Sequence, residues 1–302
     1  MTILITGATG LIGGEVVKQC HKEGISVHYL TTSKSKLKSE DNYKGFYWNP
    51  NKGEIDIACF EGVSAIINLV GASIAQRWTD ENKKIILESR TKTAQLLYSK
   101  LEEHQFPIKQ IVSASAIGYY PTSLVKYYEE DYPTVADTFL GEVVDAWEDA
   151  VDNFKNLGLS VAKVRIGLVL ASEDGALPKI TQPIKFGAGA AFGSGKQWQS
   201  WIHVEDLAKL FVFAVTEELE GVFNGVAPNP VTNTELTKTA ARVMNRPLIL
   251  PNIPKFAMKL ALGEMHIILV ESQRVSASKI EGEGFQFKYH HLEPALENLL
   301  GD

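Results

Sequence analysis

Cysteine is scarce in this chain of 302 residues. Cys20 and Cys59 are the two that it has, which is too few for the disulfide framework that holds small secreted domains together. Both lie among apolar residues, where a free cysteine usually packs as a small hydrophobic side chain. We therefore expect two reduced and buried thiols.

Long hydrophobic runs are lacking as well. No stretch approaches the ~18 apolar residues of a membrane-spanning helix, and the longest apolar runs, such as Ser64–Ala72, have the length of a β-strand. The first residues, MTILITGATG, lack the basic segment, apolar run and cleavage site of a secretory signal. The sequence predicts a cytoplasmic protein with no membrane partner.

Positive charge is outnumbered by negative charge. The chain has 30 Lys and Arg against 36 Asp and Glu, a formal net charge of −6. Proteins that bind nucleic acid through their overall field are usually basic, so we expect no nucleic-acid partner. A small-molecule substrate is expected, and a homo-oligomer is compatible with the sequence. No histidine or cysteine spacing indicates a metal site, and no Gly-x-Ser-x-Gly motif indicates a hydrolase of that type.

Hydrophobic residues make up 45% of the chain, which is enough to form a core. Along the first half of the sequence, patterns typical of strands alternate with patterns typical of helices. This alternation predicts an α/β fold, a doubly wound parallel sheet of the Rossmann type. The predicted strands are Thr2–Thr6, Ser26–Thr31, Val63–Val70, Gln110–Ser115 and Ser160–Leu170. The predicted helices between them are Leu11–Glu23, Thr79–His104 and Thr138–Leu157.

The pattern changes after residue 170. Gly187–Gly195 is too rich in glycine for a regular element, and short helices are predicted at Asn233–Met244, Pro254–Leu262 and Leu292–Leu300. We predict a dinucleotide-binding domain over residues 1–170 and a smaller, mostly helical C-terminal lobe over 171–302 that takes part in substrate binding. Residues 200–227 are expected to return to the first domain, with Val222–Ala227 joining its sheet.

A glycine loop is the sharpest motif. It has the spacing GxxGxxG and lies between the first predicted strand and the first predicted helix, as a phosphate-binding turn requires. The first glycine permits the tight turn, the second lets a pyrophosphate approach the backbone, and the third allows the helix to pack on the strand. The free N–H groups of the helix then face the phosphates. The loop consists of Gly7, Ala8, Thr9, Gly10, Leu11, Ile12 and Gly13.

The end of the second predicted strand indicates which cofactor binds. NAD-binding folds usually place an acidic residue there to hold the ribose 2′-hydroxyl. The segment Thr31–Lys36 has no acid and offers hydroxyl and ammonium groups, which can receive a 2′-phosphate. We therefore expect NADP(H) as the cofactor, with NAD(H) as the alternative.

Motifs along nearly the whole chain resemble the extended short-chain dehydrogenase/reductase superfamily. The closest resemblance is to its atypical subgroup of epimerase family proteins, which are NAD-dependent epimerase/dehydratase-like and end in a C-terminal domain of unknown function. The stretches that carry it are TGATGLIG, Asn68–Ala72, Ser113–Ala116, Ser89-Arg90 with Thr93, Gly193–Trp198, Ser200–His203 with Asp206, and a block from Gly263–Met265 through Ser272–Arg274 to Gly284-Phe285.

The resemblance implies further cofactor contacts. Thr31 and Thr32 would flank the adenosine ribose, and Arg90 could reach a phosphate as a fixed cation, although its position also suits an ordinary surface residue of a helix. Leu69, Val70 and Gly71 would line the adenine side.

The proton relay that the resemblance implies is missing. The superfamily commonly uses a Tyr-x-x-x-Lys pair on one helical face, yet none of the ten tyrosines is followed four residues later by lysine. The helix expected to carry the pair has Phe139 or Leu140 at the tyrosine position and Val143 or Val144 at the lysine position.

Other residues are therefore the catalytic candidates. Ser115 follows a central strand and could hydrogen-bond a substrate carbonyl, Tyr120 could act as an acid, and His203 could exchange a proton. A wall position for Tyr120 and a structural role for His203 are the alternatives. Trp198 and Trp201 would form flat pocket walls or pack in the core.

Two functions fit these observations. The first is an NADP(H)-dependent oxidoreductase or nucleotide-sugar-epimerase-like enzyme that acts on a small polar substrate. The second is a catalytically silent NADP(H)-binding sensor or scaffold protein. The missing Tyr-Lys pair favours the sensor, while the polar and aromatic residues near the expected substrate site favour the enzyme.

Overall fold

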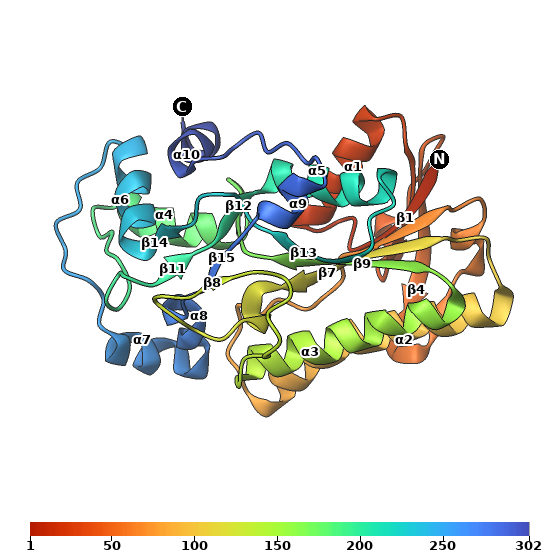
Figure 1. The fold of residues 1–302 in the computed structure, drawn as a ribbon, viewed down its shortest axis with the longest axis horizontal. Helices are drawn as coiled ribbons and strands as arrows, with labels where there is room; N and C mark the ends of the chain where they lie inside the picture. The colour runs from red at the N-terminus through yellow and green to blue at the C-terminus, as the bar shows by residue number, and fades with distance from the viewer. Residues whose placement is uncertain (302) are drawn as a thin grey trace.

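A single large parallel sheet forms the centre of the computed structural model, which describes residues 1–301 (Figure 1). Its strands follow the order β13-β9-β7-β6-β1-β2-β4-β3, and β5 pairs with β4. All pairs along this path are parallel except β3 with β4. The strands are β1 (Thr2–Thr6), β2 (Ser26–Thr31), β3 (Ser39–Glu40), β4 (Tyr43–Asn49), β5 (Glu54–Ile55), β6 (Ala65–Asn68), β7 (Gln110–Ala116), β9 (Ser160–Ile166) and β13 (Gly221–Gly225).

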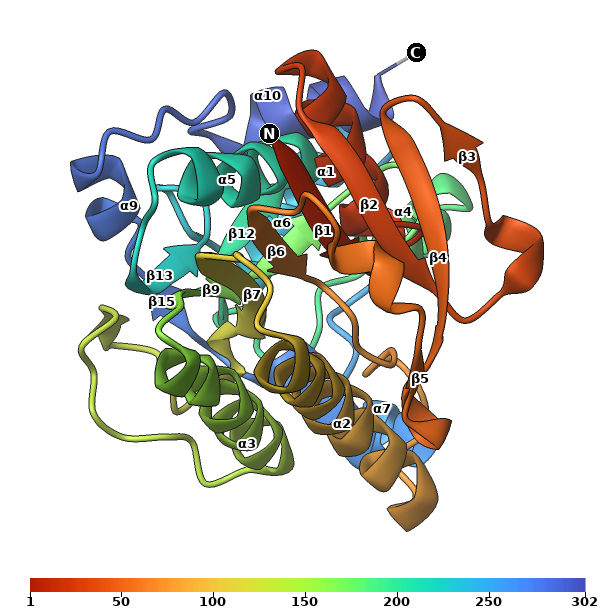
Figure 2. The ribbon, with the colours of Figure 1, turned by 90° about the vertical axis from the view of Figure 1, so that its right-hand side faces the viewer.

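Helices cover both faces of this sheet (Figure 2). On one face α1 (Leu11–Lys22) packs against α5 (Val204–Thr216), and on the other α2 (Asp80–His104) packs against α3 (Phe139–Asp152). The predicted doubly wound α/β fold is confirmed, because the central strands are parallel and helices cover both faces of the sheet. The strand order reverses between β1 and β6, which is where ligands of such sheets bind.

The second lobe is built from short elements around its own apolar core, which includes Trp201, Leu236 and Leu296. The remaining helices of the chain are α4 (Ala176–Lys185), α6 (Asn233–Val243), α7 (Lys255–Leu262), α8 (Ile267–Val270), α9 (Ser278–Gly282) and α10 (Leu292–Leu300). Three small strand pairs complete the chain: β8 (Tyr127–Tyr128) with β15 (Arg274–Val275), β10 (Leu168–Leu170) with β12 (Trp201–His203), and β11 (Trp198–Gln199) with β14 (Val231–Thr232). Short 3-10 helices span 34–36, 50–52, 57–60, 117–119, 153–157 and 263–266.

One predicted strand is two strands in the structure. The run predicted as Ser160–Leu170 breaks at Gly167, so that β9 stays in the main sheet while β10 pairs with β12. A side chain at Gly167 would overlap the carbonyl oxygen of Ser200, so this close approach requires glycine. The break directs the chain from the main sheet toward the second lobe.

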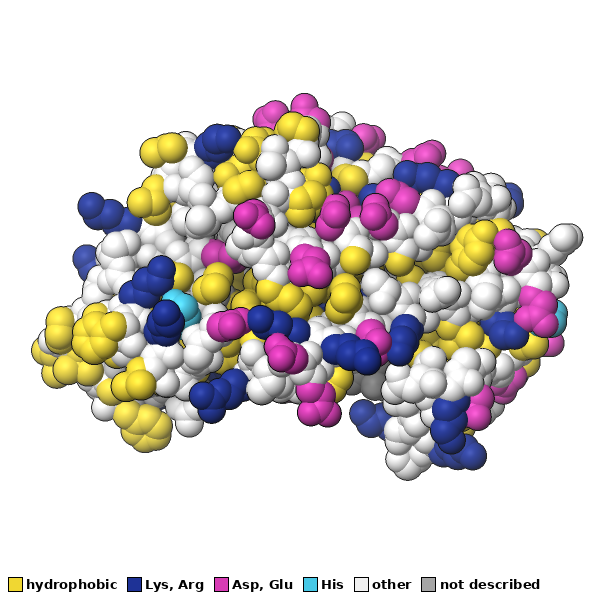
Figure 3. Space-filling view, turned by 90° about the horizontal axis from the view of Figure 1, so that it is seen from below, with side chains coloured by type: hydrophobic (Ala, Val, Ile, Leu, Met, Phe, Trp, Pro, Cys, Tyr) yellow, Lys and Arg dark blue, Asp and Glu magenta, His cyan; other side chains and the backbone are white. Residues whose placement is uncertain are grey.

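The surface carries both signs of charge. The face seen in Figure 3 has acidic and basic side chains interspersed, and hydrophobic side chains gather at the end where α7 contributes the exposed Phe256 and Leu260. Within residues 1–301 no helix is long and apolar enough to cross a membrane, and no cluster of acidic, histidine and cysteine side chains could hold a metal ion. Cys20 and Cys59 are free and buried, as expected.

Candidate cofactor and substrate site

The glycine loop joins the carboxyl end of β1 to the start of α1. Gly7 has a φ of +72°, which a side chain would strain, and the Gly10 N–H donates to the Gly7 carbonyl oxygen over 3.0 Å. A side chain at Gly13 would overlap that same carbonyl group, so the helix can approach the turn only because glycine is there. No acidic residue lies in the first turn of α1. The free N–H groups of this helix end are therefore available to an anion.

The segment after β2 forms a short basic turn, which includes the 3-10 helix Lys34–Lys36. The Thr31 side chain is buried, and its hydroxyl accepts a hydrogen bond from the Ser33 N–H over 3.2 Å. Thr32 and Lys34 are exposed, and the Lys34 ammonium lies 5.2 Å from the centre of the Tyr47 ring. In the described part of the chain neither Lys34 nor Lys36 forms an ion pair. Their charges are available to a phosphate at the end of β2.

The segment after β6 is fixed by two side chains. The Thr6 hydroxyl accepts hydrogen bonds from the N–H groups of Leu69 and Val70, over 3.1 and 3.3 Å. The Ser89 hydroxyl on α2 accepts one from the Ala72 N–H over 2.9 Å. This anchoring holds residues 69–72 beside the glycine loop, because β6 is the neighbour of β1 in the sheet. A side chain at Gly7 would meet Leu69 at 3.2 Å.

Arg90 reaches from α2 to this segment. Its Nη1 donates to the carbonyl oxygens of Ala72 and Ile86, over 3.2 and 2.8 Å. Its Cζ lies 5.0 Å from the centre of the Trp147 ring on α3, and the guanidinium packs on Gly71. Burial lowers the pKa of Arg90 to about 10, which leaves it positive at neutral pH. It has no acidic partner within residues 1–301, and an unpaired, partly buried cation favours binding of an anion.

A pocket of about 240 Å³ opens next to Arg90. Its walls come from the ends of β7 and β9, the first turns of α3, strand β11 and the segment after α8. The carboxyl ends of central strands are where doubly wound sheets bind ligands. The lining is mostly apolar or aromatic and includes Ile74, Leu140, Val143, Val144, Trp147, Ile166, Leu168, Trp198 and Ile268, with polar contributions from Arg90, Gln199, Ser200, Glu271 and Gln273.

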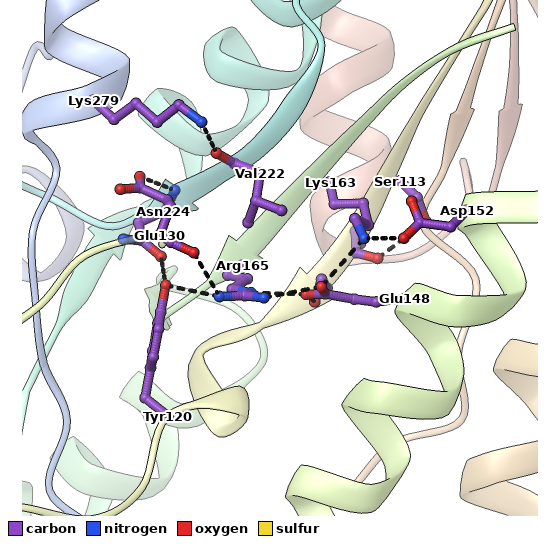
Figure 4. A network of polar contacts seen from close by, with 12 residues as sticks. Ser113, Tyr120, Glu130, Glu148, Asp152, Lys163, Arg165, Val222, Asn224 and Lys279 are labelled. Atoms are coloured by element: carbon purple, nitrogen blue, oxygen red, sulfur yellow. Dashed lines mark hydrogen bonds and ion pairs between the residues drawn. The ribbon is translucent and has the colours of Figure 1, made fainter. Parts of the chain in front are cut away.

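The catalytic candidates Ser115 and Tyr120 lie outside this lining and belong to a buried polar network. Figure 4 shows Tyr120 in this network together with Glu148 and Arg165. The Ser115 hydroxyl donates to Glu148 Oε1 on α3 over 2.6 Å. Arg165 on β9 donates to both oxygens of Glu148, over 2.8 and 3.0 Å. The Tyr120 hydroxyl donates to Asn224 Oδ1 over 2.7 Å and accepts from Arg165 over 3.1 Å. The hydroxyl groups of both candidates are thus committed to partners within the protein.

The ionisation of this network follows from its burial and its pairing. Burial opposes the negative charge of Glu148, but the hydrogen bonds and charge of Arg165 outweigh it and hold the pKa of that carboxyl below its usual value. Burial raises the pKa of Tyr120 to about 12, although the nearby Arg165 works in the opposite direction. The phenol therefore stays protonated at neutral pH, which suits a structural hydrogen bond better than proton exchange.

His203 lies elsewhere, at the start of α5. Its Nδ1 accepts a hydrogen bond from the Glu205 N–H over 3.1 Å, and Nε2 lies 3.1 Å from Asn298 Oδ1. The imidazole stacks on the Tyr289 ring at 4.1 Å between centres, and burial lowers its pKa. This arrangement is that of a helix N-cap. Of the two tryptophans, Trp198 lines the pocket and Trp201 is buried in the core of the second lobe.

Several lining residues were not singled out from the sequence. The missing pair draws attention to Leu140, Val143 and Val144 in the sequence, but it does not point to Trp147, Ile166 or Glu271. Glu271 directly precedes the Ser272–Arg274 stretch of the resemblance, which was the available signal for it.

Three features lie at the same edge of the sheet: a glycine loop of the phosphate-binding type, an end of β2 without acidic residues, and a pocket. Together they define a Rossmann-type nucleotide-binding protein. The chain belongs to the NAD dependent epimerase/dehydratase family, whose pattern matches residues 3–225, and residues 253–299 match a domain of unknown function, DUF1731. An epimerase family protein of Staphylococcus aureus is 36% identical over 298 residues, with 98% of both chains covered. One of Staphylococcus saprophyticus is 37% identical over 302 residues, again with 98% of both covered.

Solved structures agree with this family assignment. The human epimerase family protein, isoform 2, solved with NADPH, has a TM-score of 0.84 at 28% identity and 99% coverage of both chains. A nucleoside-diphosphate sugar epimerase from Corynebacterium glutamicum has a TM-score of 0.79 at 27% identity, covering 100% of this chain and 58% of that one. The predicted family resemblance is therefore confirmed.

Proposed function

We propose that this protein is an NADP(H)-dependent oxidoreductase or epimerase-like enzyme that acts on a small substrate in the pocket beside Arg90. The observation that carries the proposal is the continuity of the two sites. The glycine loop, the segment 69–72 and the pocket follow one another along the carboxyl edge of β1, β6 and β7. When bound, NADP(H) supplies or accepts a hydride at its nicotinamide ring.

The chain's own residues fit this cofactor. The absence of a side chain at Gly10 lets a pyrophosphate approach the backbone at the start of α1, and Gly13 lets that helix pack closely on the turn. Thr32, Lys34 and Lys36 would hold the 2′-phosphate, because they are exposed and no acid in Thr31–Lys36 would repel it. A human relative of the same family solved with NADPH supports the phosphorylated cofactor.

The hydroxyl groups of Ser115 and Tyr120 then act as structural groups of the buried network, and His203 acts as a helix cap. Their partners within the protein support this assignment over the catalytic roles expected from the sequence. Leu140 and Val144, both apolar, line the pocket at the positions where the Tyr-x-x-x-Lys pair is expected. This last observation also supports the alternative, a silent NADP(H)-binding sensor.

A charge substitution at the end of β2 tests the cofactor preference. Thr32→Asp places a carboxylate where the 2′-phosphate is expected. Repulsion between these two negative groups opposes binding by about 1.4 kcal/mol, or roughly tenfold in Kd. We expect calorimetry to show NADPH binding weakened about tenfold, with NADH binding unchanged or improved. Thr32→Asn is the matched control, since it changes shape without adding charge. Equal effects of both substitutions on NADPH and NADH would contradict the preference.

Turnover distinguishes the enzyme from the sensor. The full chain is assayed with NADPH and small carbonyl compounds, and with UDP-sugars in the presence of NADP+ or NAD+. Turnover of any of these supports the enzyme. Tight NADPH binding without turnover of any of them supports the sensor.

A further inference from the structure

The α3 wall of the pocket has no side chain that could donate a proton to a substrate. Leu140 and Val144, four residues apart, turn two aliphatic side chains into the pocket. Within residues 1–301 the pocket lining has two charged side chains, Arg90 and Glu271. Arginine stays protonated in proteins and does not exchange protons at neutral pH. Glu271 is thus the one ionisable group of the lining that can.

The backbone around Glu271 is held on several sides. Its N–H donates to the Ile267 carbonyl oxygen over 2.9 Å, at the end of α8. The next residue, Ser272, is anchored to the loop after β7: its N–H donates to Thr122 Oγ1 over 2.9 Å and its hydroxyl donates to the Ser123 carbonyl oxygen over 2.7 Å. This anchoring ties the backbone beside Glu271 to the loop that follows β7.

The carboxyl group itself is only lightly engaged. Gln273 Nε2 lies 3.4 Å from Glu271 Oε2, and in residues 1–301 Oε1 makes no hydrogen bond. No basic side chain forms an ion pair with it in that range. Burial raises the pKa of Glu271, and the Gln273 amide offsets this in part. Arg90 is the one charged group that shares the cavity with it, and its positive charge would favour a negative oxygen on a bound substrate.

We propose that Glu271 is the acid–base residue of the pocket and exchanges a proton with the carbonyl or hydroxyl oxygen of a small substrate with an apolar body. The proposal rests on the proposed function, in which NADPH is the reductant. In the reducing direction the carbonyl carbon gains a hydride and the π electron pair of the C=O bond moves to oxygen. Glu271 gives its proton to that oxygen and becomes a carboxylate. The products are an alcohol and NADP+, and a proton from water restores the acid.

The walls of the cavity define the substrate class. Leu140, Val143 and Trp147 offer apolar surface. The polar groups are Arg90 on α2 and a second set on β11 and the segment after α8, namely Gln199, Ser200, Glu271 and Gln273. Such a lining fits an aldehyde or ketone whose oxygen points to Glu271 and whose body packs on the α3 wall.

The first test measures the protonation of Glu271 without any cofactor. A group whose pKa is raised by folding contributes stability that is fully present below the unfolded pKa and is lost as pH rises through the folded pKa. Wild-type chain should therefore lose stability relative to Glu271→Gln as pH rises from about 4.3, the ordinary glutamate value. Glu283→Gln, at an exposed position in the same region, should follow the wild-type pH dependence. Parallel curves for all three proteins would overturn the proposal.

The second test is turnover with NADPH and benzaldehyde, with NADPH affinity measured in parallel. Removing a proton-transfer group lowers the rate by about 10²–10⁴-fold. We expect Glu271→Gln to lower kcat by at least a hundredfold while the Kd for NADPH stays unchanged, and Glu283→Gln to behave as wild type. Unchanged kcat in Glu271→Gln would overturn this inference alone. A wild-type chain that binds NADPH but does not reduce benzaldehyde would also overturn it, whereas failure to bind NADPH would overturn the proposed function itself.

Discussion

Neutralising Glu148 should destabilise the protein more than any surface charge substitution. The Glu148→Gln variant keeps the shape of the side chain but removes the negative charge that faces Arg165, which is 3% exposed. In this variant Arg165 can still donate a hydrogen bond to the amide oxygen. Its second donor then faces the amide NH₂ group, which cannot accept a hydrogen bond. Lys163, 3.4 Å from Glu148 Oε2, is affected less because Asp152 Oδ2 lies 2.8 Å away.

The magnitude follows from the geometry of the pair. Breaking a buried ion pair by removing one partner usually lowers stability by about 3–5 kcal/mol, because the other charge is left uncompensated. The amide oxygen of glutamine preserves part of the hydrogen bonding, so we expect a loss near the lower end, about 3 kcal/mol. Glu293→Gln is the control. It removes an exposed ion pair with Arg242, and such pairs contribute about 0–1 kcal/mol.

Urea unfolding across pH provides the assay. The folded pKa of Glu148 lies below its usual value, so its contribution to stability is present above the unfolded pKa and is lost as pH falls through the folded pKa. The difference between wild type and Glu148→Gln should thus be constant near neutral pH and should shrink below about 4.3. A loss no larger than that of Glu293→Gln, or a difference independent of pH in the acid range, would refute the reasoning.

Two further substitutions test the structural roles of the other candidates. Tyr120→Phe removes a buried hydroxyl that serves Asn224 and Arg165, so it should lower the free energy of unfolding by about 1–3 kcal/mol in urea titrations. Its NADPH affinity should match wild type, and a loss of turnover without a loss of stability would contradict this role. His203→Ala removes a helix cap and should lower stability by about 1 kcal/mol. Its kcat should be retained, and a hundredfold fall would restore His203 as a catalytic candidate.

The parts of the fold that depend on local patterns could be predicted from the sequence. The strands Thr2–Thr6 and Ser26–Thr31 have the predicted bounds, and the long helix predicted at Thr79–His104 spans Asp80–His104 with the Thr79 side chain as its cap. Gly167 shows the limit. The break there is due to the approach of Ser200, a contact across more than thirty residues that no local pattern reveals.

The sequence also does not reveal to which face of the sheet each side chain of the central strands points. Both faces of β7 are buried, so its residues show no alternation of polar and apolar positions that would tell which way each points. Ser115 was therefore expected at the ligand, whereas its hydroxyl turns to Glu148 on α3. Glu271 was missed for a related reason, because only the folded chain brings the segment after α8 to the end of β7.

A co-crystal structure of the chain with NADPH tests the central claim most directly. The account predicts the pyrophosphate at the Gly10 N–H and the start of α1, the 2′-phosphate next to Thr32 and Lys34, and the nicotinamide at the Arg90 side of the pocket, where it faces the substrate space between Leu140 and Glu271. Density for NADPH with the nicotinamide outside this pocket, or with the 2′-phosphate away from the basic turn, would contradict it.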